Sequence, residues 1–352
     1  MPARTGAQYL ATLKDHSPEV WIGADRVRDV TTHPATRGAA AEFARLYDLQ
    51  HDARYRDFAL FPSPKTGELV STQFLLPRSV EDWRQRRQLH KLWADATFGG
   101  MGRTTDFMAA MIAGWYVSAD HFGEYAGNVR TYFEFVRDND LFLTHTLIDP
   151  PVDRSKPPSR QADEFTYLGA VRETDQGLIV RGAKMLATAC PFADELLVWS
   201  FSFSLGQYGP EDAKYILGFA IPCTSPGLRF ISREPYGIGR NRFDHPLSSR
   251  FDELDGVAVF DDVLVPWERV FIYRDIDKVK RMYQTAMAAF SAHQTGIRFW
   301  SKLELLAGLA KSGSALLRTD HNLHIQDMIA EMTTLLELTK SVIIAAEAQA
   351  ET

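Results

Sequence analysis

The sequence predicts an α+β fold in which a helical region, a β region and a second helical region follow one another along the chain. Two patterns carry this prediction. Apolar residues recur at helical spacing before residue 140 and again after residue 275. Between these points lie short β-rich runs without helical crossovers, which favours an antiparallel sandwich or barrel. We therefore expect an N-terminal helical domain at 1–140, a central β domain at 141–275 and a C-terminal helical domain at 276–352.

The composition is that of an ordinary globular protein. The chain has 352 residues, of which 45% are hydrophobic and 24% charged, and its net charge is −6. Nucleic-acid binding needs a basic face, so this acidic balance argues against such a partner. No apolar run is long enough for a signal peptide or a membrane span, and we expect a cytoplasmic protein. Cys190 and Cys223 are too few for a disulfide framework or a cysteine-ligated cluster.

Helical periodicity and capping residues predict five helices before residue 140. In one of them Trp83, His90 and Trp93 recur at helical spacing, with Ser79 as the expected N-cap and Asp82 three residues later. Residues 20–30 alternate as in a β hairpin. The predicted helices cover residues 6–15, 37–50, 80–97, 107–119 and 128–138.

The central region contains seven β-rich runs that are expected to form strands. They cover residues 165–171, 177–180, 184–189, 195–203, 215–222, 228–231 and 257–260. Long helices are then expected at 277–311 and 325–351. The last one has no cap and no partner helix after it, so we expect the third domain to be incomplete.

Several common motifs are absent or broken. The run GIGRNR at 237–242 is half of a dinucleotide fingerprint, but Arg242 replaces the third glycine and no βαβ unit surrounds it. The chain has no Walker A, GxSxG or HExxH motif. His321 and His324 could face one way on a helix, but a solvated helix start is the preferred interpretation, and no metal is expected.

Four segments are poorly explained by local structure. They are GRTTDF at 102–107, LTHTLIDPPVDR at 143–154, GAKMLAT at 182–188 and DHPLSSRFDE at 244–253. Arg103 stands at a helix start, where a cation opposes the helix dipole, and His145 lies in an apolar run. Taken singly, Arg103 is most simply an ion-pair partner, His145 a core histidine and Thr188 a strand residue.

Together, these segments resemble the 4-hydroxyphenylacetate 3-hydroxylase family, the oxygenase components of two-component monooxygenases that use reduced FAD. The resemblance also includes DVTTHPATR at 29–37, FDELDGVAVFDDVLVPWERVFIYRD at 251–275 and HQTGIRFWSKLELLAGLA at 293–310, and so covers essentially the whole chain. It implies the acyl-CoA dehydrogenase-like fold, with an N-terminal helical domain, a central β domain and a C-terminal helical bundle. It also implies a homotetramer, or a dimer.

The resemblance assigns roles residue by residue. Arg103 matches the active-site arginine, and Phe107 stands where the family has a substrate-binding tyrosine. His145 would contact both substrate and flavin, and Thr188 would lie against the isoalloxazine. His293 matches a histidine that acts as the base in the chlorophenol and nitrophenol branch. The resemblance further places Ser202 and Phe203 in a substrate-lining loop, and Thr146, Leu147, Pro151, Val152, Asp153 and Arg154 around the FAD.

The implied chemistry is the hydroxylation of a phenolic ring. Reduced FAD, rather than FMN, would react with O2 to give a C4a-hydroperoxyflavin, and a separate NAD(P)H-flavin reductase would supply the reduced flavin. Phe107 lacks the tyrosine hydroxyl, so we expect a substrate other than 4-hydroxyphenylacetate itself.

Two alternatives stay open. One is another flavoenzyme of the same fold, a dehydrogenase or dehydratase, although two cysteines cannot ligate the dehydratase cluster. The other is a non-catalytic, truncated paralogue. For a chain of this length we expect weak or no activity.

Overall fold

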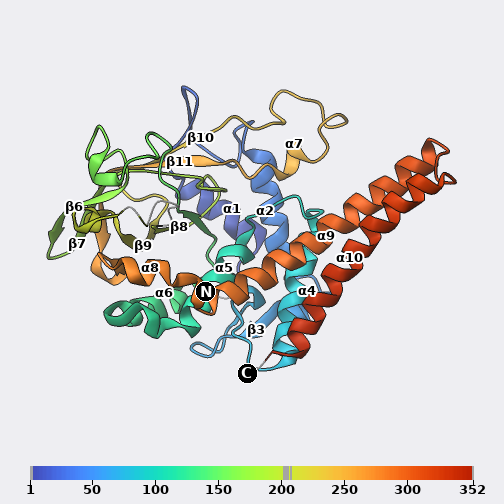
Figure 1. Cartoon of the computed structure of the whole chain (residues 1–352), viewed down its shortest axis with the longest axis horizontal. Helices are drawn as coiled ribbons and strands as arrows, with labels where there is room; N and C mark the ends of the chain where they lie inside the picture. Colours follow the sequence, from blue (N-terminus) through green and yellow to red (C-terminus); the bar gives the residue numbers. More distant parts are fainter. Residues whose placement is uncertain (1–2, 201–205, 207, 351–352) are drawn as a thin grey trace.

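The computed structural model describes residues 3–200, 206 and 208–350. Helices surround one end of a β region, and two long C-terminal helices extend away from the body (Figure 1). The N-terminal helices are α1 (Gly6–Asp15), α2 (Arg37–Leu49), α3 (Arg56–Ala59), α4 (Val80–Ala96), α5 (Thr105–Val117) and α6 (Ala126–Asp138). Two hairpins, β1 (Val20–Ile22) with β2 (Asp25–Val27) and β3 (Leu60–Pro62) with β4 (Leu69–Ser71), lie between them.

The cap predicted at Ser79 is confirmed. Ser79 Oγ accepts a hydrogen bond from the Asp82 N–H at 3.1 Å and begins α4. Thr5 and Gln8 form a reciprocal capping box at the start of α1. By contrast, α5 is apolar on all sides and buried along most of its length, as expected of a helix in the centre of a core.

The β region consists of two sheets. The larger has the order β2-β1-β10-β11-β7-β6 and the smaller the order β12-β9-β8-β5. Phe219 of the smaller sheet packs against Phe260 of the larger, with ring centroids 6.2 Å apart. The remaining strands are β5 (Leu143–Thr146), β6 (Gly169–Thr174), β7 (Gly177–Met185), β8 (Glu195–Trp199), β9 (Leu217–Pro222), β10 (Leu228–Ser232), β11 (Gly256–Pro266) and β12 (Val270–Tyr273).

The pairing differs from the prediction in two places. Most pairs are antiparallel, but β1 pairs with β10 and β5 with β8 in parallel. The chain between β5 and β8, which is described throughout, contains β6 and β7 and no α-helix, and the chain between β1 and β10 contains many helices and strands. Neither connection is a single crossover helix that would mark a parallel pair in the sequence. β1 and β2 come before residue 140 in the sequence but belong to the larger sheet of the β region. The domain boundary at residue 140 stays a prediction.

The single strand β7 replaces two predicted strands. The sequence suggested a break near Gly182, but the strand continues through this residue at φ +122°. A Cβ at this position would lie 2.3 Å from the Tyr167 carbonyl oxygen. Glycine therefore lets the strand bend past a neighbouring backbone instead of ending there.

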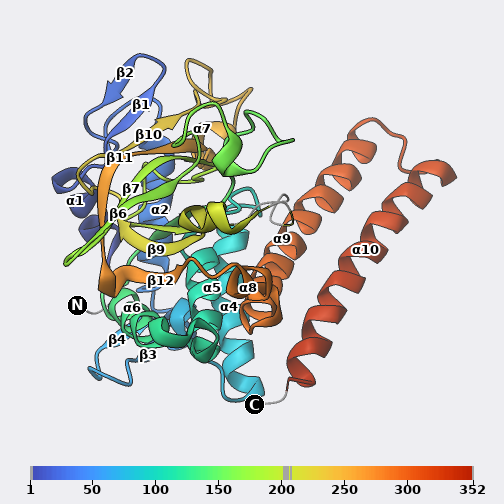
Figure 2. The same cartoon turned by 60° about the vertical axis from the view of Figure 1, so that its left-hand side comes forward.

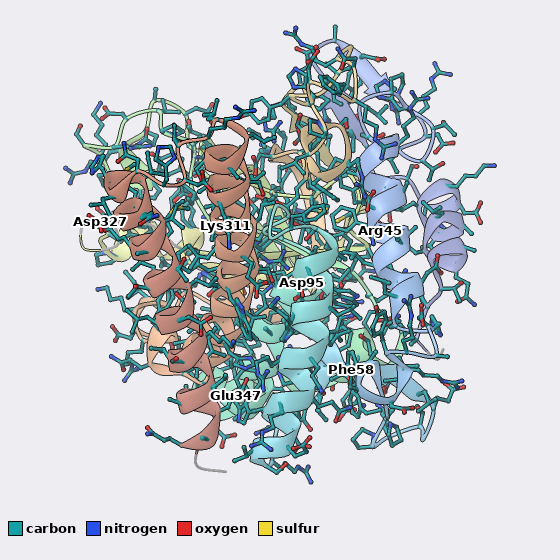
Figure 3. All side chains as sticks on the ribbon, turned by 90° about the vertical axis from the view of Figure 1, so that its right-hand side faces the viewer. Arg45, Phe58, Asp95, Lys311, Asp327 and Glu347 are labelled. Atoms are coloured by element: carbon teal, nitrogen blue, oxygen red, sulfur yellow. The ribbon has the colours of Figure 1, made fainter. Side chains whose placement is uncertain are left out.

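The C-terminal region contains α8 (Ile276–Lys280), α9 (Met287–Leu316) and α10 (Leu323–Ala348). The single helix predicted at 277–311 is wrong, because Thr285 is extended and its hydroxyl donates to the Met282 carbonyl at 2.6 Å. In Figures 2 and 3, α9 and α10 form a hairpin, and α4 lies beside it. At Gly114 the backbones of α5 and α9 are so close that a Cβ would lie 2.5 Å from Met287 Cα. In the described parts of the chain, each helix is too short or too polar to cross a bilayer.

Candidate active site

Arg103 and Phe107 lie at the start of α5 and face one another. The guanidinium carbon of Arg103 is 3.9 Å from the centroid of the Phe107 ring. The Arg103 backbone N–H donates to the Glu253 carboxylate, and its Nε has no hydrogen-bond partner among the described residues. Burial lowers the pKa of the Arg103 guanidinium, while the nearby Glu253 carboxylate acts in the opposite direction. Arg103 is thus a partly desolvated cation over an aromatic face.

His145 completes this group from β5. Its ring centroid lies 5.4 Å from that of Phe107, and its side chain is buried, with 7% exposed. Burial, assisted by the positive charge of Arg103, lowers the pKa of His145 to about 3. Its Nδ1 has no hydrogen-bond partner among the described residues. At neutral pH, His145 is therefore an uncharged imidazole with one ring nitrogen free to contact a ligand.

A cavity of about 570 Å³ adjoins this group. Arg103 and Thr188 both line it, so the structure brings together two side chains that are 85 residues apart in the sequence (188 − 103). The Thr188 hydroxyl donates to Asp255 Oδ1 at 2.6 Å, and the Thr144 hydroxyl donates to the Thr188 carbonyl. The remaining lining comes from Phe98, Gly100, Arg233, Tyr236, Leu247, Ser248, Phe251, Asp252, Glu253, Asp255, Lys302, Leu305 and Leu306.

The segment after β5 is fixed to β7. The Thr146 hydroxyl donates to the Met185 carbonyl at 2.9 Å. Lys184, only 2% exposed, donates to the Leu147 carbonyl at 3.2 Å and pairs with Asp149 at 2.7 Å. Sequence reasoning missed Lys184 and Asp149, although both belong to segments that it singled out. A charged residue inside a β-rich run was the signal that could have identified Lys184.

The other predicted cofactor residues lie farther out on the same segment. Pro151 and Arg154 are exposed, and Val152 is 63% exposed. Asp153 Oδ1 accepts hydrogen bonds from the Ser155 N–H and hydroxyl, which closes a local turn. Residues 151–154 therefore form a largely exposed surface outside the buried group of Arg103, Phe107 and His145. The predicted substrate residues Ser202 and Phe203 lie outside the described residues.

His293 lies where α4, α9 and α10 meet. Its Nε2 contacts Glu347 Oε1 at 2.9 Å, and its ring packs against Trp83 at 4.9 Å and His90 at 6.1 Å between centroids. Burial lowers its pKa. Figure 3 shows Glu347 at the end of α10 nearest α4. The contacts of His293 thus belong to the helix junction rather than to the Arg103, Phe107 and His145 group. The role of His293 as a base stays a prediction.

These residues fit a planar heteroaromatic cofactor. The cavity has the size of a small-molecule site. The unpartnered Arg103 Nε and His145 Nδ1 are buried polar atoms that a ligand can satisfy. A larger groove of about 810 Å³ lies elsewhere, with a lining that comes from α9, α10 and the turn between them. We take the smaller cavity as the candidate site because Arg103 and Thr188 line it, and Arg103 contacts Phe107, which packs against His145.

The α+β architecture and this cavity define a protein of the acyl-CoA dehydrogenase-like fold class with a candidate small-molecule site. The family models described as 4-hydroxyphenylacetate 3-hydroxylase N terminal and C terminal match residues 5–272 and 280–352. The chain belongs to the 4-hydroxyphenylacetate 3-hydroxylase family. This confirms the family and the fold class predicted from the sequence.

Individual relatives agree with this assignment. The 4-hydroxyphenylacetate 3-monooxygenase oxygenase component of Thermus thermophilus is 43% identical over 350 residues, which are 99% of this chain and 71% of the relative. The pyoverdin chromophore biosynthetic protein PvcC of Pseudomonas aeruginosa is 36% identical over 97% of this chain and 67% of its own length. A solved oxygenase component complexed with FAD and 4-hydroxyphenylacetate superposes with a TM-score of 0.93, at 41% identity, over 99% of this chain and 72% of that chain.

A more distant structure shows the fold alone. An archaeal 4-hydroxybutyryl-CoA dehydratase from N. maritimus superposes with a TM-score of 0.81 at 21% identity, over 99% of this chain and 70% of that one. The sequence comparisons do not favour the dehydrogenase or dehydratase alternative, because the relatives of higher identity are named as monooxygenase components.

Proposed function

We propose that the chain binds FAD and hydroxylates a phenolic ring, as the oxygenase component of a two-component monooxygenase. The observation that carries this proposal is the placing of Arg103 and neutral His145 against Phe107, beside the cavity that Thr188 lines. Relatives named as 4-hydroxyphenylacetate 3-monooxygenase components, and a solved relative with FAD and 4-hydroxyphenylacetate, support it.

The side chains have separate tasks in this reaction. Reduced FAD, when bound, supplies the oxygen-activating chemistry. The cation of Arg103 stabilises the negative charge that develops on the substrate oxygen as its proton is shared with His145 Nδ1, and does so strongly because it is partly desolvated. Neutral His145, in the tautomer protonated at Nε2, accepts a hydrogen bond from the phenol hydroxyl at Nδ1. The Phe107 ring offers an apolar face to the substrate ring and helps to exclude water.

The cofactor contacts follow from the same arrangement. Thr188 would lie against the isoalloxazine, and Thr146 and Leu147 would hold the cofactor near β7, where Lys184 and Asp149 fix the backbone. The exposed stretch at 151–154 would cover its outer part. We assign Ser202 and Phe203 to the substrate loop and His293 to proton transfer on the resemblance alone.

The proposal includes partners. A separate NAD(P)H-flavin reductase, a small aromatic substrate and O2 complete the system, and we place the protein in the cytoplasm. A homotetramer, or a dimer, is proposed on the resemblance and on the many exposed apolar side chains of α9 and α10, among them Leu309, Leu335 and Val342.

The test uses the full chain with FAD, NADH and a flavin reductase. A panel of 4-hydroxyphenylacetate, phenol, 4-chlorophenol and 4-nitrophenol is offered, and hydroxylated product and H2O2 are measured separately. We expect at least one hydroxylated product, an outcome that would contradict the weak or absent activity expected from the length of the chain. We expect Arg103→Met to lower kcat/KM for it by about 100-fold, the usual effect of removing one charge-stabilising donor. Bound FAD with H2O2 as the only product for every aromatic would contradict the proposal. Failure to bind FAD would favour the non-catalytic alternative.

A further inference from the structure

Three side chains from different parts of the chain anchor the segment that carries Arg103 and Phe107. Glu253, just before β11, accepts the Arg103 backbone N–H. The other two anchors meet at Asp106, which is fully buried. His90 Nδ1 of α4 contacts Asp106 Oδ2 at 2.9 Å, and Arg298 of α9 contacts Asp106 Oδ1 at 3.3 Å. Arg298 also donates to the Thr104 hydroxyl.

This arrangement replaces an ordinary helix cap. Thr104 is the N-cap residue of α5, yet its hydroxyl makes no hydrogen bond to an N–H of the first turn. A threonine or aspartate at a helix start usually satisfies such an N–H. Here the Thr104 hydroxyl donates to Asp106 and accepts from Arg298. The first turn of α5 is therefore held by a tertiary contact with α9 rather than by its own cap.

The contact between Arg298 of α9 and Asp106 of α5 has a high desolvation cost. Arg298 is 7% exposed and Asp106 fully buried, so both charges have lost most of their hydration. Such burial costs several kcal/mol per ion, and apolar side chains would give similar stability. What the charged contact adds is direction, since a guanidinium binds oxygen atoms only in its own plane. Close packing of α9 against α5 at Gly114 keeps Arg298 in register with the site.

We propose that Arg298 is a positioning residue for the hydroxylation. Through Thr104 and Asp106 it sets the start of α5, so that Arg103 and Phe107 meet His145 in the geometry that directs the activated oxygen to the substrate ring. His90 orients the Asp106 carboxylate from the opposite side. This inference rests on the proposed function. It places part of the control of the site in a helix of the C-terminal region.

The test compares Arg298→Met with Arg298→Lys in the full chain. Methionine keeps the length and apolar packing but has no donor. We expect the yield of hydroxylated product per NADH consumed to fall about 10-fold, with a matching rise in H2O2, because a small displacement of a catalytic group costs this much or more. The dissociation constant of FAD should change less than about 2-fold. Lysine keeps the charge and one donor nitrogen, so it should recover part of the lost yield.

A matched control is Arg269→Met. It removes another partly buried ion pair, between Arg269 and Glu195 at 2.8 Å, which lies outside the site. The product yield should stay at the wild-type value. An unchanged yield in Arg298→Met, or an equal loss in Arg269→Met, would overturn the inference. If Arg298→Met does not fold, Thr104→Val removes the hydroxyl in the same contact and should reproduce the loss of yield.

A second readout separates this inference from the proposed function. Amide hydrogen exchange of residues 102–107 should be at least about 10-fold faster in Arg298→Met than in the wild type, while exchange in α6 stays the same. This holds even if the wild-type chain hydroxylates none of the aromatics, an outcome that contradicts only the proposed function. Equal exchange at 102–107 in both proteins would contradict the positioning role.

Discussion

At the scale of single residues, the site depends on Phe107, which contacts both Arg103 and His145. Its ring is 3.9 Å from the Arg103 guanidinium and 5.4 Å from the His145 ring. A tyrosine at this position, as in the family pattern, would add one hydroxyl to a region where Arg103 Nε and His145 Nδ1 are unpartnered among the described residues. The residue at 107 therefore decides how many polar contacts a substrate can make.

Phe107→Tyr is the first variant to test. We expect kcat/KM for 4-hydroxyphenylacetate to rise about 10-fold, which corresponds to about 1.4 kcal/mol from one added hydrogen bond in a buried site. For a phenol that the wild-type chain already accepts well, the change should be smaller. Steady-state product formation measures both. A fall in kcat/KM for every phenol would show that the hydroxyl is excluded rather than used.

The sequence identified these residues for a definite reason. Arg103 and His145 were each out of place locally, one as a cation at a helix start and one as a histidine in an apolar run. Their meeting could not be predicted from periodicity, because β5 and α5 approach through the tertiary fold. Arg298 and Asp255 were missed because each looks ordinary in its own segment, as a helix residue and a turn residue.

At the scale of elements, the contact between α4 and α5 should make stability depend on pH. Burial lowers the pKa of His90 to about 4, against the effect of the Asp106 carboxylate, so His90 is neutral in the folded state at neutral pH. In the unfolded chain its pKa is near 6.5. As the pH falls from about 6.5 toward 4, the unfolded state binds a proton that the folded state does not, and stability is lost.

His90→Asn tests this sign. Asparagine can donate to Asp106 from about the position of Nδ1, but it does not titrate. We expect the free energy of unfolding to fall less steeply between pH 6.5 and 4.5 in this variant than in the wild type, as measured by urea unfolding. His16→Asn, at an exposed histidine, is the control and should keep the wild-type slope. Equal slopes in all three proteins would show that His90 does not titrate differently on unfolding.

Elements were predictable where the signal is local. The helix at 6–15 matches the prediction at both ends, and the helix at 80–97 differs by one residue, because caps and apolar periodicity mark both. The prediction was wrong at Gly182 and at Thr285. At Gly182 the outcome depends on the close approach of another backbone segment. At Thr285 it depends on a side chain that donates to the carbonyl of Met282.

At the scale of the whole molecule, Arg4 ties three parts of the chain together. It is 2% exposed. Its Nε donates to the Asp140 carbonyl at 2.8 Å, and its Nη2 donates to Asp194 Oδ2 at 2.6 Å and to the Tyr47 hydroxyl at 2.8 Å. These contacts join the N-terminus to α2, to the chain just before β5 and to the chain just before β8. One side chain thus holds the helical and β regions in a fixed relation.

Arg4→Met should therefore destabilise the protein strongly. It leaves Asp194, whose side chain is 10% exposed, without its ion-pair partner and removes the cation near the buried Asp140 carboxylate. Breaking a buried pair typically costs about 3–5 kcal/mol. The midpoint of urea unfolding, followed by fluorescence and by circular dichroism, measures this loss. Arg54→Met, which removes an exposed pair with Asp52, is the control and should leave the midpoint unchanged. Similar midpoints for both variants would show that the Arg4 contacts are dispensable.

The parallel pairing of β1 with β10 has a consequence for how the protein is made. Val20 pairs with Phe230, so the hairpin of β1 and β2 leaves the ribosome long before its partner strand exists. At a synthesis rate of about 5–20 residues per second, the wait is roughly 10 to 40 seconds. During this interval β1 presents an unpaired edge, which is the kind of surface that pairs wrongly with other chains. A chaperone that binds the first 30 or so residues of the nascent chain would cover this edge until β10 is made.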